Sequence, residues 1–332
     1  MNSVYHSTEG DSYNTSGEHP TGPTGNVAHV AILMCTYNGA KFLPQQLESF
    51  VRQTHTQWSL HVSDDGSSDE TLSLLETYTL SNRRQKCQVI EGPRAGFVRN
   101  FLSLSCRSDI QADYYAWSDQ DDIWKDEKLE VAVKWMQEVP PHIPAIYCGR
   151  TQLIDEDNSH IGMSPNFSRP PHFKNALIQS IAGGNTMLFN KAARALIVKA
   201  GAHLTVPSHD WWCYQLVCGA GGIVHYDPVP QVLYRQHTGN IIGSNADWRA
   251  RAQRLVMVFE GRFYDWNTQN IKALESMCHQ LSEEHRKTLA LFKRTRKQRL
   301  PARVLNMLRT GLYRQTLLGN LGLALATLLR KI

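Results

Sequence analysis

The stretch that decides the fold is HVAILMC, residues 29–35, a nearly uninterrupted run of apolar residues. Such a run is typical of a strand that is covered on both faces, as in a parallel sheet. Polar residues follow it at once, in the order Thr36, Tyr37 and Asn38. We therefore expect a buried strand with polar side chains at its carboxyl end, which is where open α/β sheets bind their ligands.

The rest of the chain alternates between extended and helical patterns. The extended patterns lie at 58–63, 87–92, 114–118, 145–148, 185–189 and 223–226, and the helical ones at about 41–53, 69–80, 97–105, from Lys125 onward, 190–200 and 209–218. Strands separated by helices of this length predict a doubly wound α/β sheet. We expect residues 27–246 to form this domain.

Both ends of the chain have a composition of their own. Residues 1–26 are rich in Ser, Thr, Gly, Asn, His and Pro, which predicts a disordered leader. Residues 247–332 are predicted to form a helical extension. From Arg286 to Ile332 the chain holds twelve Lys or Arg and no Asp or Glu, out of 35 basic and 30 acidic residues in all. This leaves 23 basic against 30 acidic residues elsewhere, and such segregation predicts an anionic partner for the tail.

The basic tail also has the pattern of an amphipathic helix, with Arg309 and Arg314 near the two edges of an apolar arc. The residues of that arc are Val304, Leu305, Met307, Leu308 and Leu312. Such a helix lies in a membrane interface, so an anionic membrane surface is the predicted partner. The alternative is a helical hairpin that packs on the domain and leaves its arginines in solvent. The apolar run 316–329 is shorter than the roughly 20 residues that span a bilayer.

The cysteines and the N-terminal composition predict a cellular compartment. The seven cysteines form no Cys-x-x-Cys pair, which argues against a disulfide framework or a structural zinc site and favours a reducing cytoplasm. No basic segment followed by an apolar run marks a secretory signal. We expect a cytoplasmic protein on the inner face of the membrane. Nucleic acid is not a predicted partner, because no binding motif accompanies the basic tail.

Two acidic clusters follow predicted strand ends. DDGSSD, residues 64–69, is either a turn that caps the next helix or a site where a carboxylate accepts the imide N–H of a uracil or thymine base. Tyr37, at the neighbouring strand end, could stack on that base. DQDD, residues 119–122, is either an acidic loop before a helix or a site for Mg²⁺ or Mn²⁺, because clustered carboxylates repel one another unless a cation compensates.

Two further clusters lie downstream. In SHDWW, residues 208–212, Asp210 would lie in the first turn of a helix, where an acidic residue ordinarily just complements the helix dipole. The adjacent tryptophan pair is unusual, and aromatic surface beside a carboxylate suits a sugar ring. In YRQH, residues 234–237, two cationic side chains follow a strand, where they could neutralise a leaving diphosphate.

Taken in order, these segments resemble the family-2 glycosyltransferases of the GT-A fold, over about residues 27–245. The motifs that carry the resemblance are VAILMCTYNGAKFLPQQLESFVRQT, HVSDDGSSDET, GFVRNF, WSDQDDIWKDEKL, GGNTMLF, SHDWW and LYRQHTGNIIG. DQDDIW followed by HDWW is most similar to the rhamnosyltransferase-like branch, which builds O-antigen and related polysaccharides. The resemblance implies a GT-A type doubly wound mixed sheet with a Rossmann-like nucleotide-binding half.

The resemblance also implies roles for individual residues. Asp210 matches the general base, although His209 precedes it where many relatives have Glu. Asp121 and Asp119 match the DxD motif and would hold the metal. The residues implied to lie near the nucleotide are Thr36, Tyr37, Asn38, Asp64, Asp65, Arg99, Asn100 and Asp119. Those implied to lie near the diphosphate or the acceptor are Asp122, His209, Trp211, Trp212, Arg235 and His237.

The implied activity is the inverting, metal-dependent transfer of a sugar, with dTDP-rhamnose as the expected donor and a UDP-hexose as the alternative. The expected acceptor is a glycan or a lipid-linked oligosaccharide. Two other classes compete with this interpretation. A catalytically silent glycan- or nucleotide-binding module has no need of a base such as Asp210. A nucleotidyltransferase usually has a Gly-rich basic loop after its first strand, whereas CTYNGAKFL has one Gly and one Lys.

Overall fold

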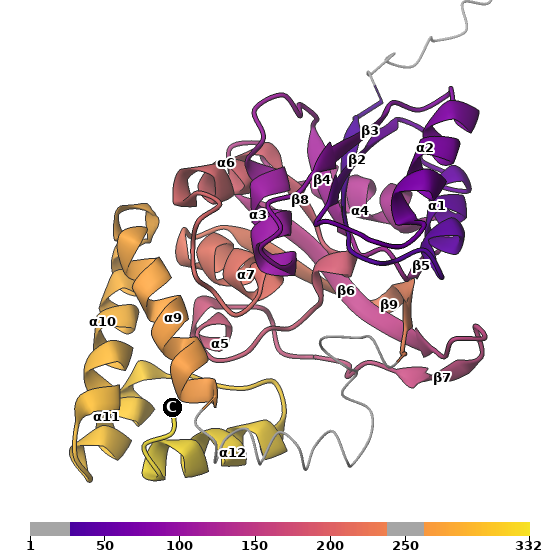
Figure 1. Cartoon of the computed structure of the whole chain (residues 1–332). Helices are drawn as coiled ribbons and strands as arrows, with labels where there is room; N and C mark the ends of the chain where they lie inside the picture. Colours follow the sequence, from indigo (N-terminus) through magenta and orange to yellow (C-terminus); the bar gives the residue numbers. More distant parts are fainter. Residues whose placement is uncertain (1–26, 238–261) are drawn as a thin grey trace, which may run out of the picture.

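The computed structural model describes residues 27–237 and 262–332. The predicted leader at 1–26 and the predicted domain boundary at 246 lie outside these residues. The described chain has one mixed sheet between layers of helices, with a group of helices at one end (Figure 1). The predicted α/β class, a doubly wound mixed sheet of the GT-A type, is confirmed.

The first half of the sheet is parallel and has the strand order β3-β2-β1-β4. Its strands are β1 (Val30–Thr36), β2 (Trp58–Asp64), β3 (Cys87–Glu91) and β4 (Tyr114–Ser118), each at a predicted position. The strand order reverses direction between β1 and β4. Ligands of open α/β sheets bind at such a reversal, beyond the carboxyl ends of the strands.

The second half makes the sheet mixed. β8 lies antiparallel to β4 and β6, whereas β6 and β9 are parallel. The remaining strands are β5 (Ile123–Trp124), β6 (Ala145–Ile154), β7 (His160–Met163), β8 (Leu188–Asn190) and β9 (Ile223–Arg235). The sequence patterns did not predict β5 and β7, because two or four residues are too few to show a period.

Helices cover both faces of the sheet. On one face lie α1 (Leu43–Val51), α2 (Thr71–Ser81) and α4 (Lys128–Gln137), and on the other α3 (Phe97–Cys106), α5 (Phe173–Ala176), α6 (Lys191–Ala200) and α7 (His209–Gly219). Because side chains alternate across a strand, β1 supplies both cores. Val30, Ile32 and Met34 pack towards the first group, and Ala31 and Leu33 towards the second.

Four helices follow the gap in the described residues. They are α9 (Arg262–Ser276), α10 (Glu283–Lys297), α11 (Ala302–Thr310) and α12 (Leu317–Leu328). They continue the core around α7, since Leu274, Leu281 and Phe292 are buried in the same cluster as Trp212. Over the residues that the structure describes, no helix is both long and apolar enough to cross a bilayer.

Candidate active site

The predicted motifs meet at one edge of the sheet. Thr36 at the end of β1 is paired with Asp64 at the end of β2, and Met34 of β1 is paired with Ser118 of β4. The residues that follow these strands therefore emerge side by side at the β1–β4 reversal. The sequence analysis expected polar clusters after the predicted strands, at the edge where this fold class binds its ligands.

The loop after β1 is bound along its backbone by side chains from the other two motifs. Four consecutive N–H groups each donate to one side chain. The bonds are Tyr37 to Gln120 Oε1 at 2.8 Å, Asn38 to Ser67 Oγ at 2.8 Å, Gly39 to Thr71 Oγ1 at 2.8 Å and Ala40 to Asp69 Oδ2 at 3.1 Å. Because the backbone of residues 37–40 is bound at every position, the loop is pre-formed rather than adaptable.

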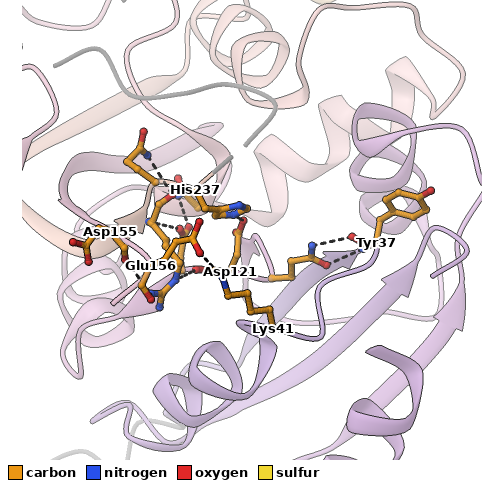
Figure 2. A network of polar contacts seen from close by, with 11 residues as sticks. Tyr37, Lys41, Asp121, Asp155, Glu156 and His237 are labelled. Atoms are coloured by element: carbon orange, nitrogen blue, oxygen red, sulfur yellow. Dashed lines mark hydrogen bonds and ion pairs between the residues drawn. The ribbon is translucent and has the colours of Figure 1, made fainter. Parts of the chain in front are cut away.

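Gln120 binds Tyr37 in both directions, since its Nε2 also donates to the carbonyl oxygen of Tyr37 at 3.0 Å (Figure 2). The tyrosine side chain is left 59% exposed at the mouth of the site. Gly39 makes room for this contact, because a Cβ there would lie 2.2 Å from Gln120 Oε1. The sequence analysis did not single out Gln120, whose only signal was its place inside the acidic cluster.

Asp64 and Thr36 hold the strand ends together. The buried carboxylate of Asp64 accepts from Thr36 Oγ1 at 2.7 Å, from the N–H groups of Gly66 (3.1 Å) and Ser67 (2.8 Å), and from Ser67 Oγ at 2.6 Å. A carboxylate has about four acceptor positions, so all of them are filled by protein groups. This differs from the predicted role of Asp64, which required a free oxygen for the base.

Asn38 and Asp65 also bind the backbone of neighbouring loops. Asn38 Oδ1 accepts from the N–H of Ser68 at 2.8 Å, and Asn38 has a φ of 48°, which Asn tolerates better than most residues. Asp65 Oδ2 accepts from the N–H of Gly96 at 2.7 Å. Both predicted nucleotide ligands therefore shape the rim of the site through these bonds.

Arg99 and Asn100 separate in the structure, although they are adjacent on α3. Asn100 is buried, and its Nδ2 donates to the carbonyl oxygen of Ser63 at 2.8 Å behind the strand end. The amide of Asn100 therefore faces β2, and its place near the nucleotide stays a prediction. Arg99 lies nearer the surface, where Nη1 is 3.1 Å from His203 Nδ1.

The carboxylate of Asp119 lies within electrostatic range of Asp121 and of Asp210. Burial, and after it the negative charges of Asp121 and Asp210, raise the pKa of Asp119 to about 8. These residues come from the end of β4 and the start of α7. Asp119 is thus affected by the charge of Asp210, which lies about ninety residues further along the chain.

Asp121 faces His237 rather than a lysine or an arginine. Its Oδ2 lies 2.8 Å from His237 Nε2 (Figure 2). The centre of the imidazole ring lies 5.1 Å from that of Phe42. The Asp121 and His237 atoms lie within hydrogen-bond distance of each other, and both are of types that can bind divalent ions. No three His, Cys, Asp or Glu side chains form a metal-binding group within the described ranges.

Arg235 is buried and its guanidinium is bound by protein oxygens. Its acceptors are the carbonyl oxygens of Asp121 (2.9 Å), Asp155 (3.2 Å) and Glu156 (3.2 Å), together with Asn158 Oδ1 (2.7 Å) and Gln45 Oε1 (2.6 Å). Figure 2 shows this network beside Asp121. The predicted contact of Arg235 with a diphosphate is therefore corrected, because the side chain instead fixes the backbone of the DxD loop.

Asp122 is also buried and joins three segments. It accepts from Asn185 Nδ2 at 2.5 Å and from the N–H of Arg235 at 3.1 Å. Lys128 is buried in the same region, where burial lowers its pKa to about 7 and the charge of Asp122 opposes that change. The prediction that Asp122 reaches the diphosphate or the acceptor is not met, because the carboxylate faces the interior.

Asp210 lies in the first turn of α7 and keeps one oxygen open. Ser208 Oγ and the N–H of Trp211, the latter at 2.5 Å, both donate to Oδ1. Among the groups that the structure describes, none donates to Oδ2. The carboxylate is therefore oriented by its own helix start, and Oδ2 is the atom that can accept a proton.

The neighbours of Asp210 belong to the core. His209 stacks on Phe101 at 4.0 Å, and burial lowers its pKa to about 4, so the imidazole is neutral. Trp211 Nε1 donates to the carbonyl oxygen of Ala176 at 2.6 Å, and Trp212 is fully buried. These three side chains are buried and hold α7 against the core, so the structure does not show them facing an acceptor.

The chain belongs to glycosyl transferase family 2, because that family's model matches residues 31–197, half of the chain. It is therefore a glycosyltransferase, as the fold and the converging carboxylates indicate. The family match covers the parallel half of the sheet and all three acidic residues of the DQDD cluster. It ends before Asp210.

The similar proteins match different shares of the chain. The dTDP-rhamnosyl transferase RfbG of Shigella flexneri is 28% identical over 68% of this chain and 78% of its own length. The UDP-Glc:alpha-D-GlcNAc-diphosphoundecaprenol beta-1,3-glucosyltransferase WfgD of Escherichia coli is 31% identical over 40% of this chain and 49% of its own. TarS of S. aureus, solved with UDP-GlcNAc, has a TM-score of 0.50 at 15% identity, with 86% and 93% covered.

Proposed function

We propose that the protein is an inverting, metal-dependent glycosyltransferase that moves L-rhamnose from dTDP-rhamnose onto a growing surface polysaccharide. The observation that carries this proposal is that Asp119, which follows β4, lies within electrostatic range of both Asp121 and Asp210. A binding module would need neither a carboxylate with an open oxygen nor a second acidic group beside it. The polysaccharide would resemble O-antigen.

The base is Asp210. A sugar hydroxyl is a weak nucleophile, so Oδ2 of Asp210 takes its proton while the hydroxyl oxygen attacks the anomeric carbon. Ser208 and the backbone of Trp211 hold Oδ1, which fixes the direction of Oδ2. The nucleoside diphosphate leaves from the opposite face of the sugar. This single displacement inverts the anomeric centre.

Asp121 and His237 would hold Mg²⁺ or Mn²⁺, with Asp119 close by. A bound divalent ion would neutralise the charge that develops on the leaving diphosphate. Two protein ligands suffice, because Mg²⁺ sites of this class are completed by substrate phosphate oxygens and water. In support, the solved structure of GalNAc-T7, whose TM-score with this chain is 0.52, contains UDP, GalNAc and Mn²⁺.

Tyr37 is the proposed stacking partner of the nucleobase. Its ring is exposed, while its backbone N–H and carbonyl are both bound by Gln120. An aromatic ring held in this way can bind a flat base without losing further freedom. Because Asp64 is saturated, recognition of the base edge would fall to neighbouring backbone groups.

The donor rests on the relative RfbG, whose printed name gives a dTDP-rhamnosyl transferase. A second candidate donor is a UDP-hexose, which is favoured by the name of WfgD, a UDP-glucose enzyme. WfgD also acts on a diphosphoundecaprenol-linked sugar. We extend this to a lipid-linked or oligosaccharide acceptor for the present chain, at the cytoplasmic face of the cytoplasmic membrane.

A donor-hydrolysis screen tests the proposal. Purified protein with Mn²⁺ is offered dTDP-rhamnose and a panel of UDP-, GDP- and CMP-sugars, and released nucleotide is measured with and without EDTA. We expect metal-dependent release from dTDP-rhamnose. Release from a UDP-sugar alone would replace the donor but keep the enzyme class. If neither release nor donor binding occurs with any sugar, the transferase proposal is wrong.

Gln120 provides a prediction about the nucleotide half of the site. Gln120→Ala removes both bonds to the backbone of Tyr37, so the ring loses its fixed orientation. We expect the KM for the donor to rise about tenfold with kcat changed less than about twofold, because two hydrogen bonds of about 1 kcal/mol each are lost before the chemical step. Steady-state kinetics with varied donor measure this.

Gln85→Ala is the matched control, because the side-chain amide of Gln85 also donates to a backbone carbonyl oxygen, that of Thr56, at 2.7 Å. We expect its kinetics to equal those of the wild type. Gln120→Glu keeps an acceptor for the N–H of Tyr37 but loses the donor, and its KM should be intermediate or worse. A fall in kcat alone for Gln120→Ala would assign Gln120 to the chemical step instead.

A further inference from the structure

Eight leucines of the last two helices and their flanks have exposed side chains. They are Leu305, Leu308, Leu317, Leu318, Leu321, Leu325, Leu328 and Leu329, here called the leucine face. Two of them, Leu308 at 74% and Leu317 at 79%, are exposed more fully than any other large apolar side chain described. Single exposed leucines are ordinary, but so many on two consecutive helices mark an interaction surface.

The leucines around α12 share one side of the helix. At about 100° per residue, all six from Leu317 to Leu329 on the leucine face fall within an arc of about 120°. Ala326 and Thr327 project outside that arc and are buried. Helix α12 thus has an inner side that packs on the protein and an outer side made almost wholly of leucine.

Arginine side chains of α10 and α11 bind the backbone at the end of α12 and after it. Arg303 Nη2 donates to the carbonyl oxygen of Leu328 at 2.9 Å, and Arg296 Nε donates to that of Ile332 at 2.8 Å. Met307 and Ile332 are buried in the domain core. The outward leucines are therefore presented on a packed scaffold. The exposure is a property of the fold rather than of a loose end.

The segment that carries the leucine face is strongly basic. Residues 286–332 include twelve Lys or Arg and no acidic residue. Exposed members of this set with no acidic partner among the described residues are Arg286, Arg294, Lys297, Arg299, Arg309 and Arg330. A second copy of the chain would bring two such basic segments together, and their repulsion opposes a dimer through this face.

We propose that the leucine face docks on an anionic phospholipid surface, with α11 and α12 lying in the membrane interface. The twelve residues of α12 are about 18 Å long, which is less than the hydrocarbon thickness of about 30 Å, so α12 lies flat. Leucines enter the acyl boundary and the flanking arginines meet lipid phosphates. This inference rests on the membrane location proposed above and names the surface that makes the contact. It does not depend on which sugar donor the enzyme uses.

Vesicle flotation of the full chain tests this proposal. We expect the protein to float with vesicles of phosphatidylcholine and phosphatidylglycerol, and much less with phosphatidylcholine alone. The triple variant Leu317→Ser, Leu318→Ser and Leu321→Ser should lower partitioning at least about tenfold, because each exposed leucine would otherwise be buried in lipid. Donor hydrolysis should be unchanged in this variant, which separates docking from catalysis.

The double variant Leu72→Ser and Leu80→Ser is the matched control, since both residues are exposed leucines of α2, far from α12 (Figure 1). It should float like the wild type. A second test replaces Arg309 and Arg330 by Gln, which should weaken binding to phosphatidylglycerol vesicles and reduce its dependence on salt. Flotation of the triple variant equal to that of the wild type would overturn the proposal. So would a dimer seen by light scattering that the triple variant abolishes.

Discussion

Asp210→Asn is expected to lower the turnover of sugar transfer at least about a thousandfold while donor affinity stays within about twofold of the wild type. The amide has the shape of the carboxylate and can still accept from Ser208 and the N–H of Trp211, so α7 keeps its start. It cannot take a proton from the acceptor. Single-turnover transfer and titration with dTDP measure the two quantities separately.

The control for this variant addresses the helix dipole. An acidic residue in a first turn stabilises its helix whether or not it is catalytic. Asp265 also lies in the first turn of its helix, α9, and is exposed, so Asp265→Asn loses a comparable dipole interaction away from the site. We expect its turnover to be normal. Near-normal turnover of Asp210→Asn would leave Asp210 with the dipole role alone.

The sequence predicted the framework of the site because the framework depends on local patterns. Buried parallel strands are continuous apolar runs, and strand order then brings their ends to one edge. From residue types alone, the four strands β1–β4 could be anticipated, whereas the role of Asp210 beside the DxD motif was implied only by the family resemblance. The distance between the strands in the sequence did not matter, because the sheet determines which ends are neighbours.

The sequence could not predict which polar side chains of a motif face the ligand. Arg235 and Asp122 are charged and follow strands, which suggested solvent-facing roles. The structure buries both, because Asn158 and Gln45, from segments far along the chain, saturate the guanidinium. A lone motif shows the charge of a side chain but not the partners that distant segments bring to it.

The same limit applies to the tail. The predicted apolar arc included Met307 and Leu308, which are adjacent in the sequence. The structure buries Met307 in the core and exposes Leu308. Periodicity shows that a helix has an apolar side, but only the packing of the domain decides which part of that side is covered. Helix α11 therefore packs on the domain and still exposes leucines, and docking of this surface on a membrane stays a prediction.

Asp121→Ala is expected to lower donor affinity in Mn²⁺ at least about a hundredfold, because even indirect partners of a metal contribute ten- to a hundredfold. The reason lies in the pair that Asp121 forms with His237 at 2.8 Å. Without the carboxylate, the imidazole alone would hold the ion, and the diphosphate would lose its bridge. Isothermal titration with dTDP in Mn²⁺ and again in EDTA measures the effect.

Removal of the metal should reproduce the variant. In EDTA, wild type and Asp121→Ala should bind dTDP equally weakly, since the difference between them depends on the ion. Asp126→Ala is the control, because Asp126 lies five residues on and pairs with Arg52 at the surface. Equal affinity of Asp121→Ala and wild type in Mn²⁺ would mean that Asp121 holds His237 in place for a structural reason.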